Sequence, residues 1–411
     1  MIELPSPLKE ILHEAARHGA TDIHIDESPD GALLRMRLEG EIRVRQKVPM
    51  ERAQKIINQV KVAAGMEPVM TILPREGQFH CRLEDRELDI RTTVVQTAER
   101  REAAHLRLLV PPQWHRDLRR LGLDDDHVAK IRESISGLQG LVLIAGPSGS
   151  GKTTTAYSMI EMLECDRLVA TSIEDPAEFD LPNVRQVEVD ERRGLTMEEG
   201  LRSILRMDPD VVLVGEVRDR ASAEITGRAA LAGRLVLATI HARDALSAIQ
   251  AMHYLSVPYY VLGSGLRLVV AQNLIRRVCS RCVRLEVPSD SECQLFQQQG
   301  LQVPKQVPRP VGCSHCEGEG YLGRTGVFEI APISEEAVNA ISSGAGRAEI
   351  LRTLRQAGAT PILADALKKV QAGITSLEEA LRFAQGGDGD ADRFNDDAAH
   401  GEVREDDPEV R

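Results

Sequence analysis

Two kinds of hydrophobic pattern alternate along the first 110 residues. Apolar residues recur at helical spacing through 8–15, which predicts an amphipathic helix. Apolar and polar residues then alternate through 23–44 and again through 79–94, which predicts two hairpins. A last strand is expected at 105–110, where Pro111-Pro112 stops it. The pattern therefore predicts a mixed α+β unit that ends at the proline pair.

The pattern changes beyond a polar, helical connector at 113–137. Four short, continuous apolar runs follow, at Leu141–Ala145, Leu168–Ile173, Val211–Val214 and Leu235–Ile240. Runs without polar alternation are typical of parallel strands that are buried on both faces. Helical stretches separate these runs, so the fold class expected here is α/β with a parallel sheet.

The last third of the chain contains three further patterns. Residues 279–328 hold two Cys-x-x-Cys pairs around a polar stretch rich in Gln and Pro. Residues 332–384 have a helical pattern, and Ser376 with Glu379 predicts a capping box before the final helix. The tail from Gly386 is rich in Gly and Asp, and we expect it to be a disordered polyanion.

Composition excludes several classes of protein. A hydrophobic content of 42% rules out a wholly disordered chain, and no apolar run approaches the ~18–20 residues that span a bilayer. No basic-then-apolar leader is present, so a secretory signal is not expected. The net charge is −12, but residues 385–411 alone hold 10 acids and 3 bases, so the body is nearly balanced. That balance, with aromatics at 3%, argues against nucleic-acid binding.

A glycine-rich segment follows the run 141–145 and precedes an amphipathic segment. It fits the pattern G-x-x-x-x-G-K-[ST], with the residues Gly146, Pro147, Ser148, Gly149, Ser150, Gly151, Lys152 and Thr153. In the strand–loop–helix context its N–H groups face phosphate oxygens. Lys152 supplies charge to the β- and γ-phosphates, and Thr153 a hydroxyl to Mg²⁺. The alternative is a chance glycine loop.

Polar residues end three of the apolar runs, at the edge where a phosphate loop of a parallel sheet lies. Glu216 follows 211–214 and is a candidate to polarise water and support Mg²⁺, or a solvated strand-end acid. Glu174 and Glu178 follow the run that ends at Ile173, either as site residues or as an ordinary acidic turn. His241 follows 235–240, and a lone histidine is more often structural than catalytic.

Four cysteines in two pairs are a candidate metal site: Cys279, Cys282, Cys313 and Cys316. Four thiolates in tetrahedral geometry suit structural Zn²⁺. The 30 residues between the pairs exceed the usual ~15–20, but a longer loop adds little closure cost. Redox dithiols or inert thiols are the alternatives. Cys293 lies between the pairs as a spare.

Five stretches together resemble the secretion ATPase family that powers type II secretion and type IV pilus assembly. They are GPSGSGKTTTAY (146–157), SIEDPAEF (172–179), GLRSILRMDPDVVLVGEVRD (200–219), LVLATIHARDA (235–245) and GCSHCEGEGYLGRTGVFEI (312–330). The resemblance covers nearly the whole chain except the tail. It implies a hexameric ring of RecA-like domains with PAS-like N-terminal domains, located at the cytoplasmic face of the inner membrane.

The resemblance also implies the site. Residues 146–153 become the Walker A loop, with Thr154 beside it, and the family's cofactors are ATP, Mg²⁺ and Zn²⁺. Glu216 becomes the catalytic carboxylate, assisted by Glu174 and Glu178, and His241 the histidine of the family's His box. The remaining residues that match are arginines. Arg91 and Arg107 match N-domain arginines that approach the nucleotide in the family, and Arg202 and Arg206 match core arginines that lie near phosphates across subunit interfaces.

The sequence departs from the family pattern in several places. Arg234 replaces the first His of the His box, Arg243 a common Asn, Met207 a common Gln and Gln78 an Arg. The longer N-terminal docking domain of many assembly ATPases is not found, so the attachment to a platform protein is open. The cysteine pairs favour export or pilus extension over retraction. The open alternatives are a nucleotide-binding scaffold with weak turnover and a DNA-uptake motor.

The resemblance implies a domain organisation in which a RecA-like core is joined to smaller parts. The segments are a PAS-like domain (1–111), a linker (112–137), the ATPase core (138–278), a zinc module (279–330), a helical subdomain (331–385) and an acidic tail (386–411).

Overall fold

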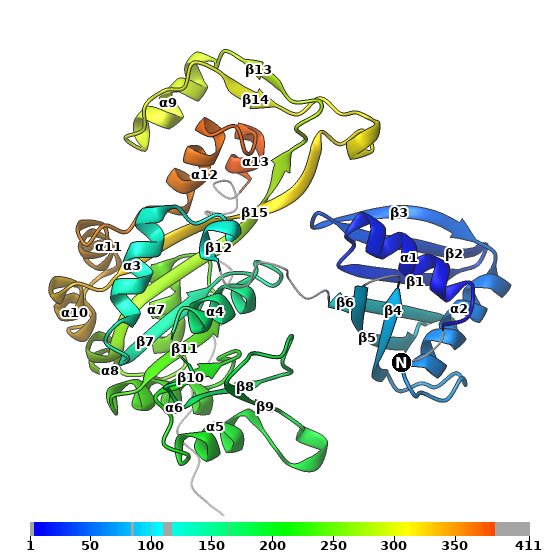
Figure 1. Cartoon of the computed structure of the whole chain (residues 1–411), viewed down its shortest axis with the longest axis horizontal. Coiled ribbons are helices and arrows are strands. Elements are labelled where there is room, and N and C mark those ends of the chain that lie inside the picture. Colours follow the sequence, from blue (N-terminus) through cyan, green and yellow to red (C-terminus); the bar gives the residue numbers. More distant parts are fainter. Residues whose placement is uncertain (1–3, 84–85, 99, 110–116, 164, 383–411) are drawn as a thin grey trace, which may run out of the picture. The chain divides into compact units, whose positions relative to one another are not determined.

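The computed structural model divides the chain into two compact units. Figure 1 labels their helices and strands. The first comprises Met1–Leu118 and Thr153–Glu216, and the second Arg119–Lys152 and Val217–Arg411. The residues that the structure describes are 4–83, 86–98, 100–109, 117–163 and 165–382. The predicted tail, the proline pair and the first part of the linker lie outside the described residues.

The first unit begins with a six-stranded antiparallel sheet in the order β3-β2-β1-β6-β5-β4. Its elements are α1 (Leu8–His18), β1 (Asp22–Ser28), β2 (Gly31–Leu38), β3 (Glu41–Val48), α2 (Met50–Ala63), β4 (Arg75–Leu83), β5 (Arg86–Gln96) and β6 (Glu102–Leu109). The first helix, both hairpins and the last strand agree with the sequence pattern. Side chains that alternate along these strands give the sheet one apolar and one polar face.

Strand β2 illustrates this division. Leu34, Met36 and Leu38 are buried in a core that also contains Leu8 and Leu12 of α1. The residues between them are arginines, which lie on the opposite, polar face. Burial of the apolar face explains the register, because a shift of one residue would expose every core side chain of the strand.

The rest of the first unit is α/β. Strand β8 (Ala170–Glu174) lies between β10 (Val211–Val214) and β9 (Val184–Glu188), and both pairings are parallel. Helix α5 (Met197–Leu205) packs against β8. The short 3-10 helix η2 (Glu191–Arg193) precedes α5. The parallel strands predicted at 168–173 and 211–214 are confirmed.

The second unit is built around β7 (Gly140–Ala145), which lies between β11 (Leu235–Ile240) and β12 (Leu266–Val278) in parallel. Strand β15 (Tyr321–Pro332) runs antiparallel to β12. The other elements of the second unit are η1 (Leu118–Leu121), α3 (Asp125–Ile135), α4 (Lys152–Glu161, continuing into the first unit), α6 (Arg220–Leu231), α7 (Ala245–Tyr254), α8 (Tyr259–Gly265), β13 (Arg284–Glu286), α9 (Asp290–Gln298), β14 (Val307–Arg309), η3 (Ser314–Cys316), α10 (Glu335–Ser342), α11 (Arg347–Gln356), α12 (Ile362–Gln371) and α13 (Leu377–Leu381). The strands β12 and β15 were not predicted.

Two expectations for the C-terminal third need correction. The stretch between the cysteine pairs is folded: β13 pairs with β14, and Phe296 of α9 is buried in the cluster formed with Leu367 and Val370. Ser376 caps α13 by accepting the N–H of Glu379, but that carboxylate does not complete a capping box. It accepts the N–H and the guanidinium of Arg276 instead, because a buried carboxylate beside an arginine gains more from the charged pair.

Among the described residues, no helix has the length and apolar character that crossing a membrane requires.

Candidate functional site

The glycine-rich loop connects the buried strand β7 to a helix that begins at Lys152. Gly149 and Gly151 have φ values of +74° and +87°, in the left-handed region that favours glycine. At Gly146, a Cβ would lie 2.5 Å from the carbonyl oxygen of Gln272, so only glycine fits there. Lys152 is buried, and its Nζ donates to the carbonyls of Gly146 (2.8 Å) and Pro147 (3.1 Å). The ammonium therefore lies across the loop, where a phosphate would be held.

Strand β12 supports this loop through Gln272, a residue that the sequence analysis missed. Its side-chain Nε2 donates to the carbonyl of Ser150 over 2.7 Å, and the side chain is buried. The contact joins residues 122 positions apart and belongs to a strand that was not predicted, so no local signal pointed to it. Gln272 thus holds the loop at Ser150.

In the first unit, Glu174 ends β8 as a buried carboxylate with three side-chain donors. Tyr157 donates to one of its oxygens, and Ser172 (2.5 Å) and Gln186 (3.2 Å) donate to the other. Burial and the nearby Glu174 carboxylate raise the pKa of Tyr157, which keeps its hydroxyl a donor. None of these three partners was predicted from the sequence. Tyr157 lies one helical turn after Thr153, so the two share a face of α4, but that spacing by itself does not point to Glu174.

Glu178 lies in the turn that follows β8. Burial raises its pKa, while a hydrogen bond from Thr153 and the charges of Arg91 and Arg107 oppose that change. The guanidinium of Arg91 also donates to the carbonyl of Ala177 over 2.9 Å. The structure thus brings together Thr153, Glu178 and the two arginines that the sequence analysis selected from β5 and β6.

Glu216 lies just after the end of β10, from which Gly215 separates it. The N–H of Gly215 donates to the carbonyl of Ile173 over 2.8 Å. A Cβ at Gly215 would lie only 3.0 Å from the Cα of Glu174, so glycine allows the two strand ends to approach closely. Glu216 and Glu174 therefore leave neighbouring strands at the same edge, as parallel pairing requires.

His241 follows β11 in the second unit. The last residue of that strand, Ile240, pairs with Ala145, and its carbonyl accepts the N–H of Gly146 over 3.3 Å. His241 is exposed and leaves the sheet at the position where the glycine-rich loop begins. The register of β7 and β11 thus places the histidine at the edge predicted for it.

Arg202 and Arg206 are exposed and have partners within their own segment. Arg202 donates to Glu198 over 2.8 Å, and Arg206 to the hydroxyl of Ser203 over 3.2 Å. The structure does not bring these two arginines to the Glu174 and Glu178 carboxylates.

The four cysteines of the two Cys-x-x-Cys pairs converge. Their sulfurs all lie within 4.8 Å of one another, and the close Sγ–Sγ distances are 4.0, 3.7 and 3.8 Å. A tetrahedral zinc ion with Zn–S bonds of about 2.3 Å requires sulfurs roughly 3.8 Å apart, so the four side chains fit Zn²⁺. The pairing of β12 with β15 joins Val278 to Tyr321, and the N–H of Cys279 donates to the carbonyl of Gly320 over 2.8 Å, so Cys279 lies beside the segment that links η3 to β15.

Backbone groups around Cys316 favour its thiolate. Burial opposes ionisation, but the N–H groups of Cys313 (3.3 Å) and Gly320 (3.2 Å) donate to its sulfur and lower its pKa to about 6. Such N–H···S contacts are the outer shell expected of a thiolate ligand. All four cysteines are free of disulfides.

A second group with metal-ligand side chains is formed by Asp124, His127 and Asp365, whose ligand atoms also lie within 4.8 Å of one another. Lys368 and Lys369 pair with the two carboxylates at 3.4 and 2.5 Å. Two positive charges already balance the two negative ones, so a divalent cation would add uncompensated charge beside the buried side chains of His127 and Asp365. Burial lowers the pKa of His127, which keeps its ring neutral. This group is an ion-pair cluster that joins α3 to α12.

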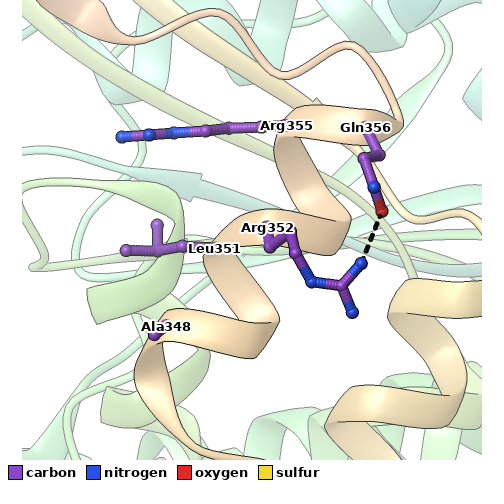
Figure 2. Close-up of a pocket in the computed structure, with 5 residues that line it drawn as sticks. All are labelled: Ala348, Leu351, Arg352, Arg355 and Gln356. Carbon is purple, nitrogen blue, oxygen red and sulfur yellow. Dashed lines mark hydrogen bonds between the residues drawn. The ribbon is translucent and has the colours of Figure 1, made fainter.

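A shallow hollow of about 490 Å³ runs along α11 and is lined by Ala348, Leu351, Arg352, Arg355 and Gln356 (Figure 2). Arg352 donates to Gln356, one turn further along the same helix, over 3.1 Å. Its lining includes no residue of the glycine-rich loop and no acid. The hollow has neither the phosphate cradle nor the carboxylates that the expected chemistry needs.

A buried parallel strand, a loop whose glycines take left-handed conformations and a helix that begins at a lysine form the phosphate-binding unit of a P-loop protein. With the RecA-like α/β core around it, this unit defines the chain as a P-loop ATPase.

Comparison with known proteins identifies the family. A model described as "Type II/IV secretion system protein" matches residues 3–382, so the chain belongs to the type II/IV secretion system protein family. The chain is 37% identical to type II secretion system protein E of Aeromonas hydrophila, over 91% of this chain and 74% of that protein. It is 33% identical to the type IV pilus assembly ATPase PilB of Thermus thermophilus, over 92% of this chain and 44% of that protein. The fold resembles the Legionella pneumophila ATPase DotB at a TM-score of 0.66, with 18% identity, over 93% of this chain and 96% of DotB. The family and fold class predicted from the sequence are confirmed.

Proposed function

We propose that the chain hydrolyses Mg-ATP and that this hydrolysis powers type II protein secretion or assembly of a type IV pilus or pseudopilus. The observation that carries the proposal is the glycine-rich loop with Lys152 folded across it. Phosphate oxygens would replace the two loop carbonyls as partners of the ammonium, because a charged pair is stronger than a bond to a neutral acceptor. The named relatives, which include a secretion protein and a pilus assembly ATPase, support both outcomes.

We assign the following roles on the proposed nucleotide. The N–H groups of residues 146–154 and the Lys152 ammonium hold the β- and γ-phosphates. Thr153 exchanges its contact with Glu178 for Mg²⁺. Glu216 polarises the attacking water, Glu174 and Glu178 assist, and His241 contacts the γ-phosphate side. The charge that develops on the γ-phosphoryl is stabilised by guanidinium groups, a role we assign to Arg91 and Arg107 of the same copy and to Arg202 and Arg206 of a neighbouring copy.

We further propose that six copies form a ring. A head-to-tail contact needs two different faces on each copy. In the first unit, the segment after α2 exposes Val69, Met70, Ile72 (85%) and Leu73 (77%). In the second unit, Tyr254 (88%) and Tyr260 (65%) are exposed at the ends of α7 and α8. Apolar side chains this accessible on both units supply the two faces, with a second copy as the partner.

The four-cysteine site is proposed to hold one structural Zn²⁺ per chain. Zinc would tie the end of β12 to the segment before β15 and so hold the part of the chain that contains β13, α9 and β14, since thiolates bind it without redox change. The partner of the ring is proposed to be an inner-membrane platform protein, contacted from the cytoplasmic side, with membrane contact only through that partner. Nucleic acid is not a proposed ligand, given a net charge of −12.

Steady-state phosphate release tests the ATPase proposal. Lys152→Ala should abolish turnover and weaken ATP binding, while Glu216→Gln should abolish turnover and retain binding, because it removes only the water-activating charge. Lys305→Ala and Glu191→Gln alter exposed side chains of the same types and should leave turnover unchanged. Wild-type turnover in either site variant would reject the chemistry. Binding without turnover in the unmodified protein would identify a nucleotide-switched scaffold, and salt-dependent DNA affinity would favour the DNA motor.

A further inference from the structure

The polar face of the six-stranded sheet carries a charged cluster around Asp22 of β1. The cross-strand pairing places Asp22 opposite Arg107 and His24 opposite His105. One carboxylate oxygen of Asp22 accepts from His105 Nε2 (2.9 Å) and from Arg107 Nε (3.2 Å). The other accepts from the hydroxyl of Thr21 over 2.8 Å. This cluster lies outside the glycine-rich loop and the acids described above.

Asp22 is a buried carboxylate that can hold a neighbouring guanidinium in place. It is 6% exposed, and Arg37 Nε lies a further 3.6 Å from its second oxygen. Burial alone would raise its pKa, but the hydrogen bonds and positive charges around it depress the pKa well below the usual range. The carboxylate is therefore ionised throughout the physiological range. The ring of His24 stacks on that of His105, with centroids 4.7 Å apart, which limits the motion of His105.

Arg107 is anchored at one end only. Its Nε contacts Asp22, while the side chain as a whole is 60% exposed, so the terminal nitrogens extend from the sheet. Its neighbour across the strand pair is Arg91, which donates to Ala177 in the acidic turn. The charge of Arg107 also acts on Glu178. One edge of the guanidinium is thus fixed to the sheet, while its charge acts on Glu178 in the acidic turn.

We propose that Asp22 is a positioning residue, which orients the guanidinium of Arg107 through its Nε so that the terminal nitrogens can meet the γ-phosphoryl group of a bound nucleotide. His105 shares the same carboxylate oxygen and keeps it turned toward Arg107. Asp22 itself does not touch the nucleotide. This inference rests on the proposed function, because it gives Arg107 a phosphate to stabilise.

A double-mutant cycle on the full-length chain tests the inference. Asp22→Asn keeps the size of the side chain and removes its charge. We expect kcat to fall about 10–100-fold, because the guanidinium loses its fixed geometry, with KM for ATP changed less than about twofold. Arg107→Ala should lower kcat by at least as much. The combined variant should equal Arg107→Ala alone, because Asp22 has nothing left to position.

Asp26→Asn is the matched control. Asp26 lies four residues after Asp22, on the same strand and face, and it pairs with Arg35 over 2.7 Å. Its variant should retain wild-type kcat. A merely structural role for Asp22 predicts that the effects of Asp22→Asn and Arg107→Ala multiply, and that result would overturn the inference. Wild-type kcat in Asp22→Asn or in Arg107→Ala would overturn it as well.

Two further measurements keep the outcomes distinct. If thermal unfolding shows that Asp22→Asn does not fold, Arg107→Lys decides, because lysine keeps the charge but has no Nε to anchor. Its kcat should fall as far as that of Arg107→Ala, and wild-type kcat would refute positioning. Lys152→Ala is assayed in parallel. If it abolishes turnover while the cycle shows no coupling, only the positioning inference fails, whereas unchanged turnover in Lys152→Ala rejects the ATPase chemistry itself.

Discussion

Glu329 of β15 provides a prediction that can be worked out quantitatively. One of its oxygens accepts the N–H of Ala245, at the first turn of α7, over 3.0 Å. Burial raises the pKa of Glu329 to about 7, and the nearby Asp244 acts in the same direction, while Arg355 opposes it. Ala245 follows His241 by four residues. The carboxyl group therefore anchors the segment that leaves the His241 edge of the sheet.

The sign and size of the effect follow from the two pKa values. In the unfolded chain Glu329 has an ordinary pKa of 4.5, and in the folded chain about 7. Between these values the folded state holds a proton that the unfolded state has released, so stability falls as the pH rises through this range. The stabilisation is complete below about pH 4.5 and lost above about pH 7. The difference amounts to about 3 kcal/mol.

Glu329→Gln imitates the protonated acid at every pH and can still accept the N–H of Ala245. We expect the variant to match the wild type near pH 5 and to be more stable by about 3 kcal/mol at pH 8, or about 6–12 °C in melting temperature. Calorimetry of both proteins from pH 5 to 8.5 measures the gap. Glu349→Gln, an exposed change on α11, should show no gap. A gap that stays constant with pH, or that is largest in acid, would refute the reasoning.

Three other changes have expected outcomes. Tyr157→Phe removes a donor from a buried carboxylate and should lower stability by about 2 kcal/mol, measured by thermal unfolding, whereas an unchanged melting temperature would contradict that contact. Cys316→Ser should reduce zinc from about one ion per chain to a small fraction by elemental analysis, while Cys293→Ser should keep it, and a metal-free wild-type protein would refute the site. Ile72→Ser combined with Leu73→Ser should shift the oligomer toward monomer in light scattering without loss of folding, and an unchanged oligomer would remove this segment from the proposed interface.

Much of the local structure was predictable because its causes are local. Apolar and polar residues alternate through 34–38, so only one register buries all the apolar side chains there, and the strand takes that register. The run Val211–Val214 coincides with β10 residue for residue. The glycine-rich loop is one contiguous segment, so its glycines and its lysine define the phosphate cradle wherever the fold places them.

The side chains that complete the sites were not predictable in the same way. Glu379 fits a capping box by spacing, yet it pairs with Arg276, 103 residues earlier. The donors to Glu174 come from a helix and two strands, and none of them has a spacing that names a buried carboxylate. The contacts of Glu174 with Tyr157 and Gln186 and the pair of Glu379 with Arg276 depend on which elements become neighbours, whereas Ser172 lies two residues before Glu174 on the same strand.

Periodicity and contiguous motifs thus established the strand and helix segments, the phosphate loop and the family from the amino-acid order alone, because interactions within a few residues govern them. Folding in three dimensions decided that Gln272 supports the loop, that β12 and β15 bring two distant cysteine pairs together, and that Asp22 holds Arg107. Those contacts join residues from 34 to 122 positions apart. Such contacts form only when burial of apolar faces has selected the order of the strands.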